Sequence, residues 1–147
     1  EFTRLGRKAR RDRAMGLLER VGLADAAGKM PSEISGGMKK RVAIARAMAL
    51  DPEILFLDEP SAGLDPITSS DLDDLILQIR RDHGTTFVVV THELPSIFKI
   101  ADRCAMFDKA RHGMIALGSP VELRDSSTDD FVKRFFAREG RETAKVA

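Results

Sequence analysis

Several residue types are missing or scarce in this sequence of 147 residues. Tryptophan and tyrosine are absent and 8 phenylalanines remain, so an aromatic platform that stacks single-stranded nucleic acid is not expected. The single cysteine, Cys104, excludes an internal disulfide and a zinc site built from cysteines. Without a disulfide signal, a reducing cytosolic compartment is the expectation. No apolar run approaches the roughly 18–20 residues that span a bilayer.

Neither sign of charge is in excess. Lys and Arg number 24 and Asp and Glu number 23, which gives a formal net charge of +1, so nucleic acid is not the expected partner. The length predicts one domain, and the apolar fraction of 43% is enough for a core. The chain begins at Glu1 without a methionine or a signal-peptide pattern, as a piece of a longer reading frame would.

Helical and strand-like periods alternate along the chain, which predicts an α/β fold. Two continuous apolar runs predict strands that are buried on both faces of a parallel sheet and joined by a right-handed crossover: residues 53–58 and 85–91. Two later strands are predicted at 103–108 and 113–117. Helices are predicted over 4–21 with Thr3 as N-cap, 37–50, 68–82, 95–101, from Pro120, and 129–138. The last residues, from Arg141, are predicted to fray.

Two adjacent carboxylates follow the first of these strands. Asp58 and Glu59 precede Pro60, at the carboxyl edge where open α/β sheets bind ligands. An acid there can hold Mg²⁺, and a second acid can polarise a water that attacks phosphorus. The alternative is an ordinary strand end that enters a polar turn.

Two further features carry weaker signals. Ser35 precedes Gly36, Gly37 and Met38 at the start of a predicted helix, where backbone N–H groups and the helix dipole favour an anion. His92 follows the second predicted strand and could donate a hydrogen bond to a phosphate or a water. A glycine hinge and a local structural histidine are the alternatives.

Taken in order, these features resemble the C-terminal half of an ABC-transporter ATPase domain, from roughly Leu17 to Arg124. The resemblance implies a P-loop NTPase-type parallel sheet with flanking helices, from which the N-terminal part with the P-loop strand is missing. It also implies three parts: 1–50 in the helical signature subdomain, 51–124 in the ATPase core, and 125–147 as a C-terminal helix and tail.

The resemblance also implies a role for each matching position. Ser35, Gly36, Gly37 and Met38 match the signature motif that binds the γ-phosphate of ATP held by the opposite subunit, although Met38 departs from the common glutamine. Asp58 matches the aspartate that orders Mg²⁺, and Glu59 the catalytic glutamate. The segment from Ser61 to Asp65 matches the loop that couples the two sites of the dimer, and His92 matches the switch histidine.

The phosphate-binding loop of this family is absent. The only glycines with the spacing of Gly-x-x-x-x-Gly-Lys-Ser/Thr are Gly113 and Gly118, and no lysine follows them. The only glutamine, Gln78, lies in a predicted helix, so the glutamine loop is missing too. The sequence therefore predicts negligible ATP hydrolysis by the chain alone, and a gap in the sheet after the strand at 85–91.

A finer resemblance is to ATPase subunits of bacterial transporters of phospholipids, linked to organic-solvent tolerance. Met38 and the run from Asp65 to Thr68 carry most of it. It implies ATP and Mg²⁺ as cofactors, a second ATPase subunit, a membrane permease and lipid-binding proteins of the mammalian-cell-entry type as partners, and a place on the inner face of the plasma membrane. One alternative is a non-catalytic partial domain that pairs with an intact subunit. Another is an ABC-type ATPase that acts on ribosomes or DNA.

Overall fold

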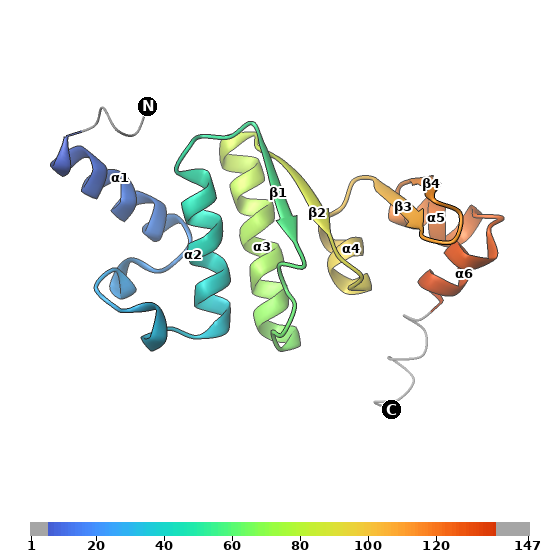
Figure 1. Ribbon diagram of the computed structural model, residues 1–147, viewed down its shortest axis with the longest axis horizontal. Helices are drawn as coiled ribbons and strands as arrows, with labels where there is room; N and C mark the ends of the chain where they lie inside the picture. The colour runs from blue at the N-terminus through green and yellow to red at the C-terminus, as the bar shows by residue number, and fades with distance from the viewer. Residues whose placement is uncertain (1–5, 138–147) are drawn as a thin grey trace. The chain divides into compact units, whose positions relative to one another are not determined.

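The computed structural model describes residues 6–137, which form an α/β chain of two compact units divided between Thr91 and His92 (Figure 1). The first unit contains three long helices, two parallel strands and two short 3-10 turns: α1 (Arg7–Arg20), Ala24–Ala26, Pro31–Glu33, α2 (Gly36–Met48), β1 (Ile54–Asp58), α3 (Pro66–His83) and β2 (Thr86–Val90). The second contains α4 (Leu94–Ile100), β3 (Cys104–Asp108), β4 (Gly113–Gly118), α5 (Pro120–Ser126) and α6 (Asp130–Phe136). None of the helices in the described range is long and apolar enough to cross a membrane.

Helix boundaries in the first unit follow local capping chemistry. The Asp65 carboxylate accepts hydrogen bonds from the N–H groups of Ile67 and Thr68, so α3 begins at Pro66 rather than at residue 68. Gly84, with φ 65°, ends it. Helix α2 ends at Met48, before the predicted residue 50. Helix α1 begins after Gly6, and the predicted cap Thr3 lies outside the described residues, as does the predicted frayed tail.

Strands β1 and β2 pair in parallel, as predicted, with Ile54 opposite Thr86 and Asp58 opposite Val90. The inward face of this sheet carries Leu55, which is 3% exposed, and α3 turns its buried apolar side chains to the same core. The prediction that both strands are buried on both faces is wrong. Outward-pointing apolar side chains remain exposed, with Phe56 at 75%: Ile54, Phe56, Val88 and Val90. No element of the described part of the first unit covers this face.

The strands form two separate two-stranded sheets in the described residues, β1 with β2 and β3 with β4. Strand β2 therefore has one paired edge and one open edge, in agreement with the predicted gap after it. Gly113 and Gly118 begin and end β4, so the one glycine pair with P-loop spacing lies in an antiparallel hairpin. The three-part division at residues 50 and 124 concerns the intact ATPase domain and stays a prediction.

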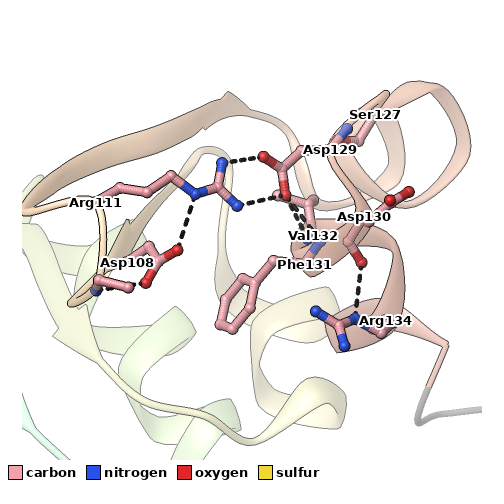
Figure 2. Close-up of polar contacts among 9 residues, drawn as sticks. Asp108, Arg111, Ser127, Asp129, Asp130, Phe131, Val132 and Arg134 are labelled. Atoms are coloured by element: carbon pink, nitrogen blue, oxygen red, sulfur yellow. Dashed lines mark hydrogen bonds and ion pairs between the residues drawn. The ribbon is translucent and has the colours of Figure 1, made fainter.

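The second unit closes around a small apolar core formed by α4, α5, α6 and the β3–β4 hairpin. Four buried side chains make up its centre: Leu94, Leu123, Val132 and Phe136. On its surface the guanidinium of Arg111, in the hairpin turn, bridges two carboxylates (Figure 2). Its Nε lies 2.9 Å from Asp108 Oδ2, and its terminal nitrogens contact both oxygens of Asp129. Asp129 in turn caps α6 by accepting from the Phe131 N–H at 2.8 Å.

This bridge predicts a pH-dependent contribution to stability. The hydrogen bond from Arg111 is the main cause that lowers the pKa of Asp129 from 3.8 to about 2. A depressed carboxyl pKa stabilises the folded state above the unfolded pKa, and this contribution disappears as the pH falls from about 4 towards 2. Arg111→Gln is therefore expected to lower the urea midpoint at pH 5, and the difference from the parent chain should shrink towards zero near pH 2. An Arg103→Gln control, at an exposed position of the same unit, should show no such pH-dependent difference.

Candidate functional site

The acidic pair lies where β1 leaves the sheet. Asp58 is the last residue of β1 and is exposed. Glu59 follows with a positive φ of 43°, a backbone conformation that side chains larger than glycine seldom adopt. Its N–H donates to the carbonyl oxygen of Val90 at 2.9 Å, so the pairing with β2 continues for one step beyond the strand. The structure thus brings this predicted pair to the carboxyl edge of the sheet.

A tight turn connects Glu59 to α3. The Ala62 N–H donates to the Glu59 carbonyl at 3.2 Å, and the Leu64 N–H donates to the Ser61 carbonyl at 3.0 Å. Gly63 takes a φ of 80°, which a glycine adopts without strain. The Ser61 side chain is 1% exposed, and its Oγ has no hydrogen-bond partner within residues 6–137. The two backbone hydrogen bonds and the buried Ser61 side chain together fix the conformation of this loop.

The turn ends at Asp65, whose carboxylate caps the N-terminus of α3. Besides the two backbone N–H groups of α3, it accepts a hydrogen bond of 2.5 Å from the Thr68 hydroxyl. This hydrogen bond is the main cause that lowers the pKa of Asp65. The carboxylate therefore stays ionised at neutral pH and holds the Thr68 side chain in place.

The glycine-opened helix is α2. Ser35 caps it, because its Oγ accepts from the Met38 N–H at 3.2 Å, and Gly36 and Gly37 are its first two residues. The first N–H groups of a helix have no partner within it and carry its partial positive charge. Helix α2, with 13 residues, presents such an end beside Ser35.

Packing explains one of these glycines. A Cβ built on Gly37 would lie 2.6 Å from Thr68 Cγ2, whereas a Cβ on Gly36 would lie 3.8 Å from Leu64 Cδ2. The start of α2 thus lies directly against the turn before α3 and the first turn of α3. The sequence pattern allowed anion binding or a hinge at this motif and did not predict a close helix contact.

Lys40 belongs to the positive charge that follows the glycines in the sequence, which either supports anion binding or is solvated, and the structure gives it a partner that this pattern did not predict. Its Nζ donates to the Glu59 carbonyl oxygen at 3.0 Å, which ties α2 to the acidic turn. A signal was present, because Lys40 shares a helical face with the buried residues Gly37 and Ile44. A cationic side chain on the inward face of a helix requires a hydrogen-bond acceptor or an anion there, because burying an unpaired charge is costly.

His92 is exposed and begins the second unit, two residues after Val90 along the chain. Its role as a switch residue beside Glu59 stays a prediction. Met38, the third residue of α2, is partly buried, and its N–H is engaged by the Ser35 cap.

The donor set fits magnesium better than a metal held by protein ligands alone. Within residues 6–137 no group of three or more His, Cys, Asp or Glu side chains is arranged to hold a metal ion. Mg²⁺ commonly takes one or two carboxylates and completes its shell with waters and phosphate oxygens. A single exposed carboxylate, Asp58, meets that requirement.

Comparisons with known proteins place the chain in context. A family model described as ABC transporter matches residues 2–62, which include Asp58 and Glu59 but not Asp65 or His92. The chain is 34% identical over 136 residues to the glycine betaine/proline betaine transport ATP-binding protein ProV of Escherichia coli, an alignment that covers 92% of this chain and 34% of ProV. It is 42% identical over 119 residues to the methionine import ATP-binding protein MetN of Caulobacter vibrioides, covering 81% of this chain and 35% of MetN.

Solved structures agree with the fold. CbiO1 from Clostridium perfringens, part of the ABC transporter complex cbiONQ, matches with a TM-score of 0.75 at 29% identity, over 92% of this chain and 51% of that one. The ADP conformation of MJ1267, an ATP-binding cassette of an ABC transporter, matches with a TM-score of 0.73 at 28% identity, over 85% of this chain and 48% of that one. The chain therefore spans about a third of these curated relatives and about half of these solved structures.

Proposed function

We propose, from its similarity to ABC transporter ATP-binding proteins, that this chain is the C-terminal portion of an ATPase subunit that drives transport across the inner membrane. One observation carries the proposal: Asp58 and Glu59 lie at the carboxyl edge of a parallel sheet, with the Glu59 N–H on the Val90 carbonyl and its own carbonyl held by Lys40. An acidic pair with its backbone fixed at both ends suits a site that must position a metal and a water.

Each residue of the site has a proposed role in ATP hydrolysis. Asp58 would hold Mg²⁺, which when bound with ATP neutralises charge on the phosphates. The Glu59 carboxylate orients a water and accepts its proton, with the backbone on either side tied to β2 and α2. Ser35, Gly36 and Gly37 present the start of α2 to the γ-phosphate of a nucleotide that a second ATPase subunit holds. His92 would serve as a hydrogen-bond donor near the γ-phosphate of the nucleotide that this chain's own subunit binds.

The uncovered sheet face supports an upstream part of the ATPase core. Phe56 is 75% exposed and Val90 59% exposed on the side of β1 and β2 away from α3. Parallel sheets are found with both faces covered, and the β2 edge away from β1 is unpaired in the described residues. A segment that supplies the phosphate-binding loop would bury this face and give the domain its nucleotide cradle.

Two classes of transported substrate can be proposed for this subunit. Met38 and the run from Asp65 to Thr68 support a phospholipid or organic solvent, with a permease and lipid-binding proteins of the mammalian-cell-entry type as partners. The named relatives support a small solute instead, since they are named for betaine and methionine. In either case we propose that the ATPase subunit lies on the cytoplasmic side of the membrane.

The experiment joins this chain to the upstream half of a related ATPase that contains the phosphate-binding loop. The fused protein is expressed in bacterial cells with a tag and purified from membranes. We expect Mg²⁺-dependent ATP hydrolysis by the fusion, none above background by this chain alone, and co-purification of a lipid-transport permease. An amino-acid permease in its place would overturn the lipid assignment and leave the ATPase assignment standing.

A non-catalytic partial domain is the second candidate, favoured by the absence of Gly-x-x-x-x-Gly-Lys in these 147 residues. Under this alternative, the chain would bind an intact ATPase subunit through Ser35, Gly36 and Gly37. A fusion that folds and binds ATP but does not hydrolyse it would support this candidate over the first.

A further inference from the structure

The first turns of α1 carry four exposed cationic side chains that form no contact stabilising the described part of the chain. Arg7, Lys8, Arg10 and Arg11 are exposed, as is every residue from 6 to 12. None of these four side chains makes a hydrogen bond or an ion pair with another residue of the described chain. Arg13, one turn further on, does the opposite, because it donates to the Ala49 carbonyl at 3.2 Å and pairs with Asp51 at 2.5 Å.

The attachment of α1 to the rest of the unit begins at Arg13 and continues at Leu17, which is 9% exposed. In Figure 1 the first turns of α1 lie farther from α2 than its last turns. The four cations therefore occupy an end of the helix that extends beyond its packing contact. We call this set, Arg7, Lys8, Arg10 and Arg11, the basic end of α1.

The basic end is unfavourable for the helix that bears it. Cations near a helix N-terminus oppose the helix dipole, and like charges three or four residues apart, as in Arg7 with Arg10 and Arg11, repel each other. Gly6 offers no side-chain cap, and the first turn holds no acidic residue. Asp12, four residues after Lys8, has the spacing to offset one of the four charges. Packing explains none of them, and a ligand that brings negative charge would relieve the remaining repulsion.

The arrangement indicates what kind of anion it is. At about 100° per residue, the four cations fall within an arc of roughly 160°, so they can face one plane together. The same turns carry no aromatic or large apolar side chain, whereas protein interfaces rely on such anchors and place few charges at their centre. A broad anionic surface without pockets suits this helix end better than a folded protein partner.

We propose that the basic end of α1 binds the anionic phospholipid headgroups of a membrane surface. Clusters of Lys and Arg on a surface helix attract such membranes, and the attraction falls off within a Debye length. The proposal adds a direct lipid contact to the proposed transporter subunit, at a surface separate from Asp58 and Glu59. It does not depend on ATP hydrolysis, so the two can fail separately.

The test uses this chain as it is, in co-sedimentation with lipid vesicles. We expect binding to vesicles of mixed phosphatidylglycerol and phosphatidylcholine and none to pure phosphatidylcholine. Binding should weaken strongly between 0.1 M and 1 M salt, where the Debye length falls from about 10 Å to about 3 Å. A quadruple variant, Arg7→Gln, Lys8→Gln, Arg10→Gln and Arg11→Gln, should lose about fivefold in partitioning for each cation removed.

A matched variant controls for net charge. Lys29→Gln, Arg46→Gln, Arg81→Gln and Lys109→Gln remove the same number of exposed cations from other surfaces and should leave vesicle binding within about twofold of the parent. Glutamine is nearly as good a helix former as arginine, and circular dichroism verifies that both variants are folded. Equal losses in the two variants, no binding to anionic vesicles, or tighter binding to an acidic peptide or duplex DNA than to vesicles would each overturn the proposal.

Discussion

Glu59→Gln in the ATPase assembled from this chain and an upstream half is expected to lower kcat by about 10²–10⁴-fold, the usual contribution of a positioned general base. Glutamine keeps the size of the side chain and cannot accept the proton of the attacking water. The hydrogen bonds at this residue to Val90 and Lys40 use only its backbone N–H and carbonyl, so the turn should keep its shape. Steady-state phosphate release, with ATP binding measured separately, gives the result.

The matched control is Glu53→Gln. Glu53 is exposed before β1, and its carbonyl accepts from the Thr86 N–H at 2.8 Å, which the substitution leaves in place. This variant should hydrolyse ATP at the parent rate. If Glu59→Gln keeps more than about a tenth of the parent kcat, the assignment of Glu59 as the base is wrong.

Gly37→Ala should destabilise the first unit by about 1–3 kcal/mol, the usual cost of an overpacked contact. The new Cβ would lie 2.6 Å from Thr68 Cγ2. The threonine cannot easily rotate away, because its hydroxyl is bonded to Asp65 at 2.5 Å and β-branched side chains in helices have few rotamers. Helices α2 and α3 must therefore move apart, and urea unfolding measures the loss as a lower midpoint at an unchanged slope.

Two further variants separate this contact from a general effect of losing a glycine. Gly36→Ala places its Cβ 3.8 Å from Leu64 Cδ2, an ordinary contact, and should change stability by less than about 0.5 kcal/mol. Thr68→Ser removes Cγ2 and keeps the hydroxyl for Asp65, so the double variant with Gly37→Ala should regain most of the loss. A double variant as unstable as Gly37→Ala alone would show that Thr68 is not the cause.

The basic end of α1 is visible in the sequence as a run of charge, which left two interpretations open: a solvated helix face, or a surface that contacts a permease helix or anionic lipid. A solvated helix face and a docking surface have the same composition. The structure separates Arg13, which pairs with Asp51, from the four exposed cations before it. The tertiary structure determines which cations form ion pairs or hydrogen bonds within the fold, because it determines which segments lie next to each other.

For strands β1 and β2 as well, the sequence predicted some properties correctly and others wrongly. Their positions, type and parallel pairing were predictable, because a short apolar run of β-branched and large residues between turn signals favours a strand. Their burial was predicted wrongly at Ile54, Phe56, Val88 and Val90, because an apolar run indicates that a face can be covered and does not indicate whether a covering segment is present.

The order of chemical groups along the chain is a property of the sequence alone. The glycine-opened helix, the acidic pair, the turn to Asp65 and the histidine after β2 are local patterns, since capping, turn and strand preferences act over a few neighbouring residues. Tertiary structure decided the contacts that join the glycine-opened helix, the acidic pair and the turn: Lys40 on the Glu59 carbonyl, Glu59 on Val90, and Gly37 against Thr68. Such contacts join residues far apart in the chain at distances of a few ångströms, and only the packing of whole elements sets those distances.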